Sequence, residues 1–325
     1  MVRDQGGGGE SFRRAYAAAT GDERRLPAFA FGDTPALADE LGRLVVEGPK
    51  RATAVLLADL EQDGDAVPAV GDRTLVLDGR GRGLCVIETV DVRVGELGSV
   101  DPAFAWDEGE GERTREDWLA VHRRFFARRC AALGLALADD LPTVFERFAV
   151  VWPRTARRPA LAVRDGLRVR MLRFDERVWA ARTLEARWGA TLVVARGVRH
   201  DAARLPGLVA SRTGQPLGLA TFRPWPGRAA ELVTLDALVP GTGAGRLLVE
   251  ALETLGRREG WSRVWTVTTN DNTPALRLYQ RAGWDLVALH RCAVAQARRH
   301  KPSIPRRGLD DIPIRHELEL ERLLG

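Results

Sequence analysis

The sequence predicts a two-domain protein of mixed α and β structure. The chain of 325 residues is long enough for two hydrophobic cores, and its 45% hydrophobic and 29% charged content is ordinary for a globular protein. Short apolar segments typical of strands alternate with amphipathic helical segments in both halves. Residues 154–166 between them are basic, contain proline and lack periodicity, so we place a linker there.

The bulk composition narrows the class of protein. The formal net charge of +5 is compatible with phosphate-bearing partners without requiring them. The cysteines, Cys85, Cys130 and Cys292, are odd in number and far apart, which favours a reducing cytoplasm over a disulfide framework. No apolar run has membrane-spanning length, the N-terminus lacks the apolar core of a signal peptide, and no two histidines are spaced as metal ligands. We therefore expect a cytoplasmic protein without a membrane partner or metal site; no feature indicates its oligomeric state.

A few side chains are rare in this chain. Of its 49 lysines and arginines, only Lys50 and Lys301 are lysines. Its only asparagines are Asn270 and Asn272, and its 2 tyrosines are Tyr16 and Tyr279. A desolvated lysine can lose its proton where an arginine cannot, and a tyrosine offers a phenolic proton. These residues are candidates for functional sites, with chance survival or, for asparagine, a cap or turn role as the alternative.

The first half predicts a small α+β domain. Residues 1–26 begin with a glycine run and are expected to form a flexible extension with one short helix at 11–19. Residues 27–153 form the domain, with a helix capped by Thr34 or Asp33 and a second helix starting at Thr114. Strands are predicted at 54–58, 73–77, 84–92 and 144–151. Short strands with two helices favour a barrel-like arrangement.

Five short motifs in this domain carry a family resemblance. They are Phe31-Gly32-Asp33, Gly48-x-Lys50-x-x-Thr53, Val70-Gly71-Asp72, Cys85-x-Ile87-Glu88-Thr89 and Glu108-Gly109-Glu110-Gly111. Together they resemble the ASCH domain, a relative of the RNA-binding PUA barrels. The resemblance implies a PUA-like small β-barrel with helices that binds RNA or a nucleoside.

The same resemblance implies a candidate catalytic set. Some small ASCH proteins are amidohydrolases that deacetylate acetylcytidine with a Lys, a Thr and a Glu, which fall here on Lys50, Thr53 and, in preference to Glu108, Glu110. A hydroxyl nucleophile needs a base, which a desolvated lysine can be, and a carboxylate can shuttle the proton. Alternatively, Lys50 contacts a phosphate, Thr53 is an ordinary strand residue and the glutamates lie in a solvated loop.

The second domain, residues 167–297, has a different order of elements. A strand at 167–174, a helical region, a hairpin at 207–221 and a strand at 231–239 precede the most informative stretch, residues 240–284. There a glycine turn opens an amphipathic helix, and a strand and a polar turn lead into a second helix. Backbone N–H groups at such a turn lie next to the positive end of the helix dipole and can bind a pyrophosphate. The alternative is a tight strand-to-helix turn that binds no ligand. Asn272, Ala275 and Tyr279 share one face of the second helix.

This stretch resembles the GNAT acetyltransferase superfamily. Gly243-Ala244-Gly245 matches the family's acyl-CoA phosphate loop, and the run from Asn272 to Tyr279 followed by Ala282-Gly283-Trp284 matches its ligand-binding helix. The resemblance implies a mixed central sheet flanked by helices, with acetyl-CoA as cosubstrate. One departure is Pro240, where the family usually has Gln or Arg, together with a loop that looks short.

The GNAT resemblance also implies roles for individual residues. Tyr279 would protonate the leaving thiolate, and Glu231 would act as base, directly or through water; the alternative for Glu231 is a surface charge. Backbone N–H groups near Leu235 would polarise the thioester carbonyl. The residues expected to bind the cosubstrate are Leu235, Gly241, Gly243, Ala244, Gly245, Arg246, Asn270, Asn272 and Ala275.

Residues 298–325 are expected to be a basic, proline-containing tail. It packs across a domain, or it contacts RNA or a CoA phosphate. Its last alternating run, residues 316–324, fits an edge strand or a helix.

The sequence as a whole predicts an acetyl-CoA-dependent N-acetyltransferase fused to an ASCH domain that binds RNA or a nucleoside. The acceptor would be a small-molecule amine or a nucleoside. Two alternatives remain open: an amidohydrolase acting on acetylcytidine-like nucleosides through the ASCH domain, and a non-catalytic RNA-binding protein with a degenerate GNAT domain.

Overall fold

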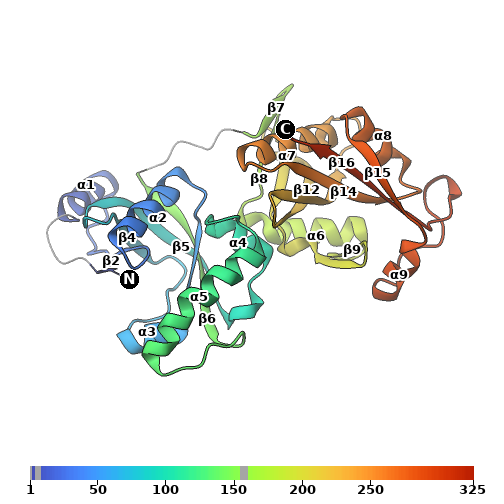
Figure 1. The fold of residues 1–325 in the computed structure, drawn as a ribbon. Helices are drawn as coiled ribbons and strands as arrows, with labels where there is room; N and C mark the ends of the chain where they lie inside the picture. Colours follow the sequence, from blue (N-terminus) through green and yellow to red (C-terminus); the bar gives the residue numbers. More distant parts are fainter. Residues whose placement is uncertain (1, 4–8, 154–159) are drawn as a thin grey trace. The chain divides into compact units, whose positions relative to one another are not determined.

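The computed structural model describes residues 2–3, 9–153 and 160–325 (Figure 1). Its chain forms two compact units, Met1–Arg157 and Arg158–Gly325, and each is described by itself. Part of the expected linker, residues 154–159, lies outside the described residues. Within the rest of it, β7 (Ala162–Arg164) pairs with β8 (Leu167–Met171). The sheet of the second unit therefore begins inside the segment expected to be linker.

The first unit is built on one six-stranded sheet in the order β1-β2-β4-β5-β6-β3. Its strands are β1 (Val2–Arg3), β2 (Ala28–Ala30), β3 (Ala52–Leu56), β4 (Arg73–Leu77), β5 (Gly83–Glu96) and β6 (Pro142–Trp152). The long strands β5 and β6 pair antiparallel with register shifts at Val86/Ile87 and Thr89/Asp91, and such bulges bend and twist a strand. The mixed α+β prediction for this half is confirmed.

Five helices cover this sheet in the described part of the first unit: α1 (Glu10–Thr20), α2 (Pro35–Glu47), α3 (Leu57–Asp63), α4 (Pro102–Glu108) and α5 (Arg115–Leu133). The caps of α2 and α5 agree with the sequence, because Thr34 and Thr114 each accept a hydrogen bond from the backbone three residues on. Helix α1 was expected within a mobile extension, yet Tyr16 is buried and packs edge-on against Trp152. The helix is part of the unit because it buries this aromatic face.

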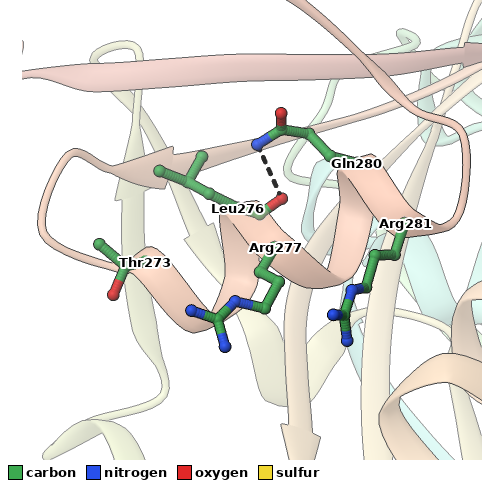
Figure 2. Close-up of a pocket in the computed structure, with 5 residues that line it drawn as sticks. All are labelled: Thr273, Leu276, Arg277, Gln280 and Arg281. Atoms are coloured by element: carbon green, nitrogen blue, oxygen red, sulfur yellow. Dashed lines mark hydrogen bonds between the residues drawn. The ribbon is translucent and has the colours of Figure 1, made fainter.

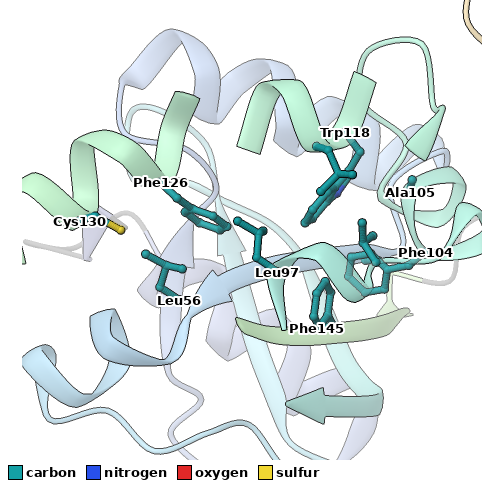
Figure 3. Packing of buried hydrophobic residues seen from close by; sticks show 11 residues of the cluster. Leu56, Leu97, Phe104, Ala105, Trp118, Phe126, Cys130 and Phe145 are labelled. Carbon is teal, nitrogen blue, oxygen red and sulfur yellow. The ribbon is translucent and has the colours of Figure 1, made fainter. Parts of the chain in front are cut away.

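The main core of the first unit joins α4 and α5 to the sheet (Figure 3). Phe104 of α4 meets Phe145 of β6 edge-on, with 5.0 Å between ring centroids, and Trp118 and Phe126 of α5 pack beside them. Burying four aromatic side chains in this way supplies much of the unit's hydrophobic stabilisation. It also fixes the end of α4, where the acidic loop begins.

The second unit contains an eight-stranded mixed sheet in the order β15-β16-β14-β13-β12-β11-β8-β7 and a separate hairpin, β9-β10. Its remaining strands are β9 (Leu192–Ala195), β10 (Val198–Asp201), β11 (Gly207–Arg212), β12 (Gln215–Trp225), β13 (Ala229–Ala237), β14 (Arg263–Thr269), β15 (Asp285–His290) and β16 (Glu317–Leu323). Its helices are α6 (Arg177–Trp188), α7 (Ala244–Arg258), α8 (Thr273–Arg281) and α9 (Ala293–His300). The predicted mixed sheet with flanking helices is confirmed.

The last 28 residues do not form the expected tail. Strand β16 lies inside the sheet, antiparallel to both β14 and β15, rather than at an edge. The side chains of Arg298 and Lys301 are bound to backbone carbonyls, and the Lys301 ammonium bonds those of Trp188 and Leu192 at 2.9 and 3.0 Å. These cations are structural here because they satisfy carbonyl groups of neighbouring segments.

In the described residues, no helix combines the length and the apolar character that a membrane crossing requires.

Candidate functional site

The sheet of the second unit opens between its two central parallel strands. The pairing of β13 with β14 ends at Leu232↔Thr266, whereas β13 continues to Ala237 and β14 to Thr269. Within the described residues, no strand pairs with this edge of β13 beyond Leu232. Its backbone groups there are left for a ligand or for water to satisfy.

A β-bulge on β13 coincides with the start of the opening. The register with β12 passes from Phe222↔Leu232 directly to Thr221↔Thr234. Val233 is thus an extra residue on β13, and a bulge of this kind reverses the alternation of side chains along the strand.

The bulge sorts the side chains of β13 onto the two faces of the sheet. Glu231 and Thr234 point to one face, and Leu232 and Leu235 point to the other. The second of these faces carries α7, since Gly245 of α7 faces Leu235. We call the face of Glu231 the acceptor face and the face of α7 the helix face.

Glu231 is buried on the acceptor face, with 4% of its surface exposed. Its Oε2 accepts a hydrogen bond from Trp225 Nε1 at 3.2 Å. Burial raises the pKa of Glu231 to about 7, although the Trp225 hydrogen bond and the charges of Arg223 and Arg196 act in the opposite direction. A carboxylate with a pKa near neutrality is suited to act as a general base.

Sequence reasoning missed a histidine next to this carboxylate. His200 of β10 is 2% exposed, and its Nε2 lies 3.6 Å from Glu231 Oε2. Burial, followed by the charge of Arg223, lowers the pKa of His200 to about 4, so the ring is neutral near pH 7. The hairpin that carries it lies between the expected helical region and the expected hairpin at 207–221, where the sequence predicts no element, and no motif marks the residue.

Tyr279 of α8 lies on the helix face. It is buried and stacks at a tilt, with 5.2 Å between centroids, on Trp284, whose indole donates a hydrogen bond to Glu253 of α7. It also interacts with the hydroxyl of Thr266, the last residue of β14 that pairs with β13. Burial raises its pKa to about 12, so the phenol keeps its proton at neutral pH. The predicted acid and the predicted base thus stand on opposite faces of the sheet, both at the start of the opening.

The glycine turn leads into α7 beside the same opening. Gly241 and Gly243 have positive φ angles of 78° and 80°, and a Cβ at either would meet no atom within 4 Å. Gly245 faces Leu235 and Ala237 of β13. The first helical N–H to bond within α7 is that of Leu247, so the preceding N–H groups point outward at the positive end of the helix.

Other predicted cosubstrate residues have structural partners. The amide of Asn270 bonds the backbone of Pro313, Arg315 and His316, and so holds the segment before β16. Asn272 is the N-cap of α8: its Oδ1 accepts from Ala275 N at 3.3 Å and its Nδ2 donates to Thr268.

Two further positions complete the predicted set. The side chain of Arg246 forms a 3.0 Å ion pair with Glu250 along α7. Ala275 is half-buried in the first turn of α8.

A shallow depression of about 450 Å³ lies on the outer side of α8 (Figure 2). It is lined by Thr273, Leu276, Arg277, Gln280 and Arg281. These residues lie on a single helix, and neither Glu231 nor Tyr279 is among them, so the depression is not part of the opening described above.

The first unit holds a second candidate site around Lys50. This lysine is 1% exposed, and its ammonium forms an ion pair with Glu110 and lies 3.7 Å from Glu108 Oε1. The ring of Phe31 lies 5.2 Å away on another side. The structure therefore brings Lys50 together with both glutamates of the acidic loop.

The loop between the two glutamates is held tightly against the lysine's backbone. Gly109 has a φ of 75°, and a Cβ there would lie 2.4 Å from the carbonyl carbon of Pro49. Arg51 N also donates to Asp107 O at 2.6 Å. Only glycine fits between the two carboxylates at this approach, which aims both of them at Lys50.

Behind Lys50, Glu108 contacts a buried aromatic pair. It accepts a hydrogen bond from Trp118 Nε1 and lies 3.5 Å from His122 Nε2. Burial would raise the pKa of Glu108, but the charges of His122 and Lys50 outweigh it and hold the pKa below its ordinary value. Sequence reasoning missed His122, whose ring stacks on Trp118 at 3.7 Å.

Thr53 is less closely engaged than the resemblance implies. It is half-buried on β3, directly across the sheet from Glu146 of β6. Glu146 accepts a hydrogen bond from Thr89 at 2.5 Å, and burial raises its pKa. No hydrogen bond of the Thr53 hydroxyl is recorded among the described residues, so its role as a nucleophile stays a prediction.

The described residues contain no group of three or more His, Cys, Asp and Glu side chains that could hold a metal ion.

Comparisons with known proteins divide the chain in the same way. One family model, the ASCH domain, matches residues 27–152, and another, the acetyltransferase (GNAT) family, matches residues 173–284. The uncharacterised protein YxbD of Bacillus subtilis is 34% identical over 138 residues, which cover 42% of this chain and 86% of that protein.

Solved structures resemble each half. An ASCH domain from Lactobacillus crispatus is 30% identical and covers 44% of this chain and 92% of its own, with a TM-score of 0.41. A B. subtilis acetyltransferase solved in complex with CoA is 16% identical and covers 49% of this chain and 99% of its own, with a TM-score of 0.37. The chain thus matches the ASCH-domain family model over residues 27–152 and the GNAT acetyltransferase family model over residues 173–284.

Proposed function

We propose that the second unit transfers an acetyl group from acetyl-CoA to the amine of a small molecule or nucleoside. One observation carries the proposal: Glu231 and Tyr279 stand on opposite faces of the sheet at the point where β13 and β14 separate. The family supports an acyl donor of this class. Acyl transfer to an amine needs a base on the acceptor side and an acid on the thiol side, and this arrangement supplies one of each.

The donor would be held at the opening and at the glycine turn. The outward N–H groups at the start of α7, around Gly243, Ala244 and Gly245, suit the pyrophosphate. The unpaired edge of β13 around Leu235 offers backbone N–H groups to the rest of the donor and to the thioester carbonyl. Pro240 contributes no N–H donor to this loop.

The proton transfers balance across the sheet. Glu231 takes a proton from the acceptor ammonium, and the freed amine forms a C–N bond to the acetyl carbon. As the C–S bond breaks, Tyr279 donates its phenolic proton to the departing sulfur. The attacking nitrogen gives up its second proton to solvent as the amide forms, and the phenolate regains one from solvent, so that the products are the amide, the free CoA thiol and protonated Glu231. Because burial keeps the phenol protonated and brings Glu231 close to neutrality, both groups are in the required state near pH 7.

The test is release of free CoA from acetyl-CoA over a panel of alkyl, aromatic, polyamine and nucleoside amines. The wild-type protein is expected to release CoA with at least one class, and the Glu231→Gln and Tyr279→Phe variants to lose most of that activity. A wild-type protein that releases no CoA above the uncatalysed rate with any class refutes the transferase proposal.

A second candidate function concerns the first unit, because a buried lysine between two carboxylates is an unusual arrangement for a structural role alone. We propose that the Lys50 site binds a nucleoside or an RNA base, with hydrolysis of an acetylcytidine-like amide as the catalytic version. Thr53 would then be the nucleophile and Glu110, which is partly exposed, the proton shuttle.

Incubating the protein with acetylcytidine distinguishes hydrolysis at the Lys50 site from binding alone. Conversion to cytidine by wild type and its loss in Thr53→Ala support hydrolysis. Unchanged acetylcytidine, combined with cytidine binding that Glu110→Gln weakens, leaves binding alone. If acetylcytidine is not converted, and neither cytidine nor single-stranded RNA binds, the proposal that the Lys50 site is functional is refuted.

A further inference from the structure

Two buried polar groups near Glu231 lack hydrogen-bond partners in the described structure. Both ring nitrogens of His200 and the indole Nε1 of Trp265 are unpaired, although the two side chains are only 2% and 7% exposed. Buried polar groups are almost always satisfied, because leaving one unpaired forfeits the hydrogen bonds it made with water. Their concentration around a candidate base therefore calls for a functional explanation.

The geometry directs one of these groups at the base. His200 Nε2 faces Glu231 Oε2 across 3.6 Å, and the same oxygen accepts the Trp225 hydrogen bond. Both of these polar contacts, as far as the described residues show, are made by Oε2 of Glu231 and not by Oε1. Catalytic hydrogen bonds are often long in ligand-free proteins and shorten when the substrate binds.

Burial, followed by the charge of Arg223, lowers the pKa of His200 and keeps the imidazole neutral, and further charges surround Glu231. Arg223 of β12 lies directly across the sheet from Glu231, Arg196 approaches from the hairpin, and Glu319 of β16 supplies a negative charge on the same face. A neutral imidazole carries one N–H donor and one bare nitrogen. A cationic partner would bind the carboxylate as an ion pair and weaken it as a base, whereas a neutral donor orients it without neutralising it.

We propose that His200 is a positioning residue, which donates its Nε2–H to Oε2 of Glu231 and thereby holds Oε1 toward the acceptor amine. This inference rests on the proposed transferase function. It assigns the β9-β10 hairpin a part in the reaction: the hairpin covers the acceptor face and brings a neutral donor to the base. His200 Nδ1, bare in this tautomer, is left as a hydrogen-bond acceptor for the substrate or for a bound water.

The test compares two substitutions of similar size. His200→Gln keeps an N–H donor, and His200→Phe fills the space without one. The carboxyl carbon of Glu231 is followed by NMR in protein labelled with ¹³Cδ-glutamate, with Glu231→Gln as the assignment control. We expect the titration midpoint of Glu231 to rise by about one to two pH units in His200→Phe, as the loss of a hydrogen bond to a charged group implies. In His200→Gln it stays near the wild-type value.

A second readout uses the wild-type protein alone. The chain has 5 histidines, so ¹⁵N correlation spectra can identify His200 by the signals lost in His200→Gln. The inference requires a proton on Nε2 and a bare Nδ1 at neutral pH. A bare Nε2 overturns it, as does an unchanged midpoint in His200→Phe or an equal shift in His200→Gln; if His200→Phe does not fold, the tautomer decides.

These measurements do not require turnover. A protein that is inactive with every amine but shows the expected coupling refutes the proposed function and leaves the His200–Glu231 pair standing. If the protein is an active transferase but the titration midpoint of Glu231 does not change in the His200 variants, only the positioning role is refuted.

Discussion

Replacing Glu231 by glutamine should stabilise the second unit at alkaline pH, because the carboxylate is held in a place where ionisation is unfavourable. The pKa of Glu231 is raised from 4.5 to about 7, chiefly by burial. For an acid whose folded-state pKa is raised, the folded protein binds the extra proton. Stability is therefore greatest below the unfolded pKa and falls as the pH rises from about 4.5 through 7.

The size of this effect follows from the same two values. Each unit of pKa shift is worth about 1.4 kcal/mol, so Glu231→Gln should gain on the order of 3 kcal/mol at pH 8 and less than about 1 kcal/mol at pH 5. Glutamine has almost the shape of the acid and can still accept the hydrogen bond from Trp225. The gain should thus come from the removed charge and not from repacking.

Hydrogen exchange at the amides of β13 measures this gain within the full chain. Protection of β13 should increase on the order of a hundredfold in Glu231→Gln relative to wild type at pH 8, and only severalfold at pH 5. The exposed Glu185 on α6 offers a matched control, since Glu185→Gln should leave the ratio near one at both values. An equal ratio for Glu231→Gln at pH 5 and pH 8 would refute the reasoning.

Three further substitutions test other parts of the account. Tyr279→Phe should lower kcat at least about a hundredfold in the CoA-release assay while leaving acetyl-CoA affinity nearly unchanged, and an undiminished kcat would exclude the phenol as acid. Gly109→Ala places a Cβ 2.4 Å from the Pro49 carbonyl carbon and should destabilise the first unit by at least about 2 kcal/mol in urea denaturation; a smaller loss would show that the loop shifts easily. Lys50→Met leaves Glu108 buried without its cation and should lower the free energy of unfolding of that unit by about 3–5 kcal/mol. The double variant Lys50→Met, Glu108→Gln should regain part of this stability. If it regains none, the loss does not come from the unpaired charge of Glu108.

Both domains and the order of their main strands could be predicted from the sequence, because glycine turns, caps and periodic apolar residues act locally. Thr34 and Thr114 cap the helices that were assigned to them, and Gly243 opens α7. Strand β16 was harder to place, because an alternating run shows that a strand forms but not which strands it will pair with. Helix α1 is held by Tyr16, whose burial depends on the distant Trp152.

The candidate sites were predictable only in part, and for the same reason. The rarity of lysine singled out Lys50, which is buried, and its functional role stays a prediction; the equally rare Asn270 holds the backbone before β16. The β-bulge at Val233 decides which face Glu231 occupies, and it arises from the pairing of two strands rather than from a local motif. His200 reaches Glu231 through tertiary contact alone, which no spacing in the sequence reveals.

Calorimetric titration of acetyl-CoA into the wild-type protein and into Gly243→Asp tests the central claim most directly. Gly243 is the N-cap of α7, with open space around it and a left-handed φ of 80°. Aspartate is one of the few other residues that adopt this conformation, at some cost in stability, and it sets a negative charge where the pyrophosphate would bind. The account predicts binding at micromolar concentrations by wild type and at least about tenfold weaker binding by the variant. No heat from wild type at high micromolar acetyl-CoA, or equal affinity in the two proteins, would contradict it.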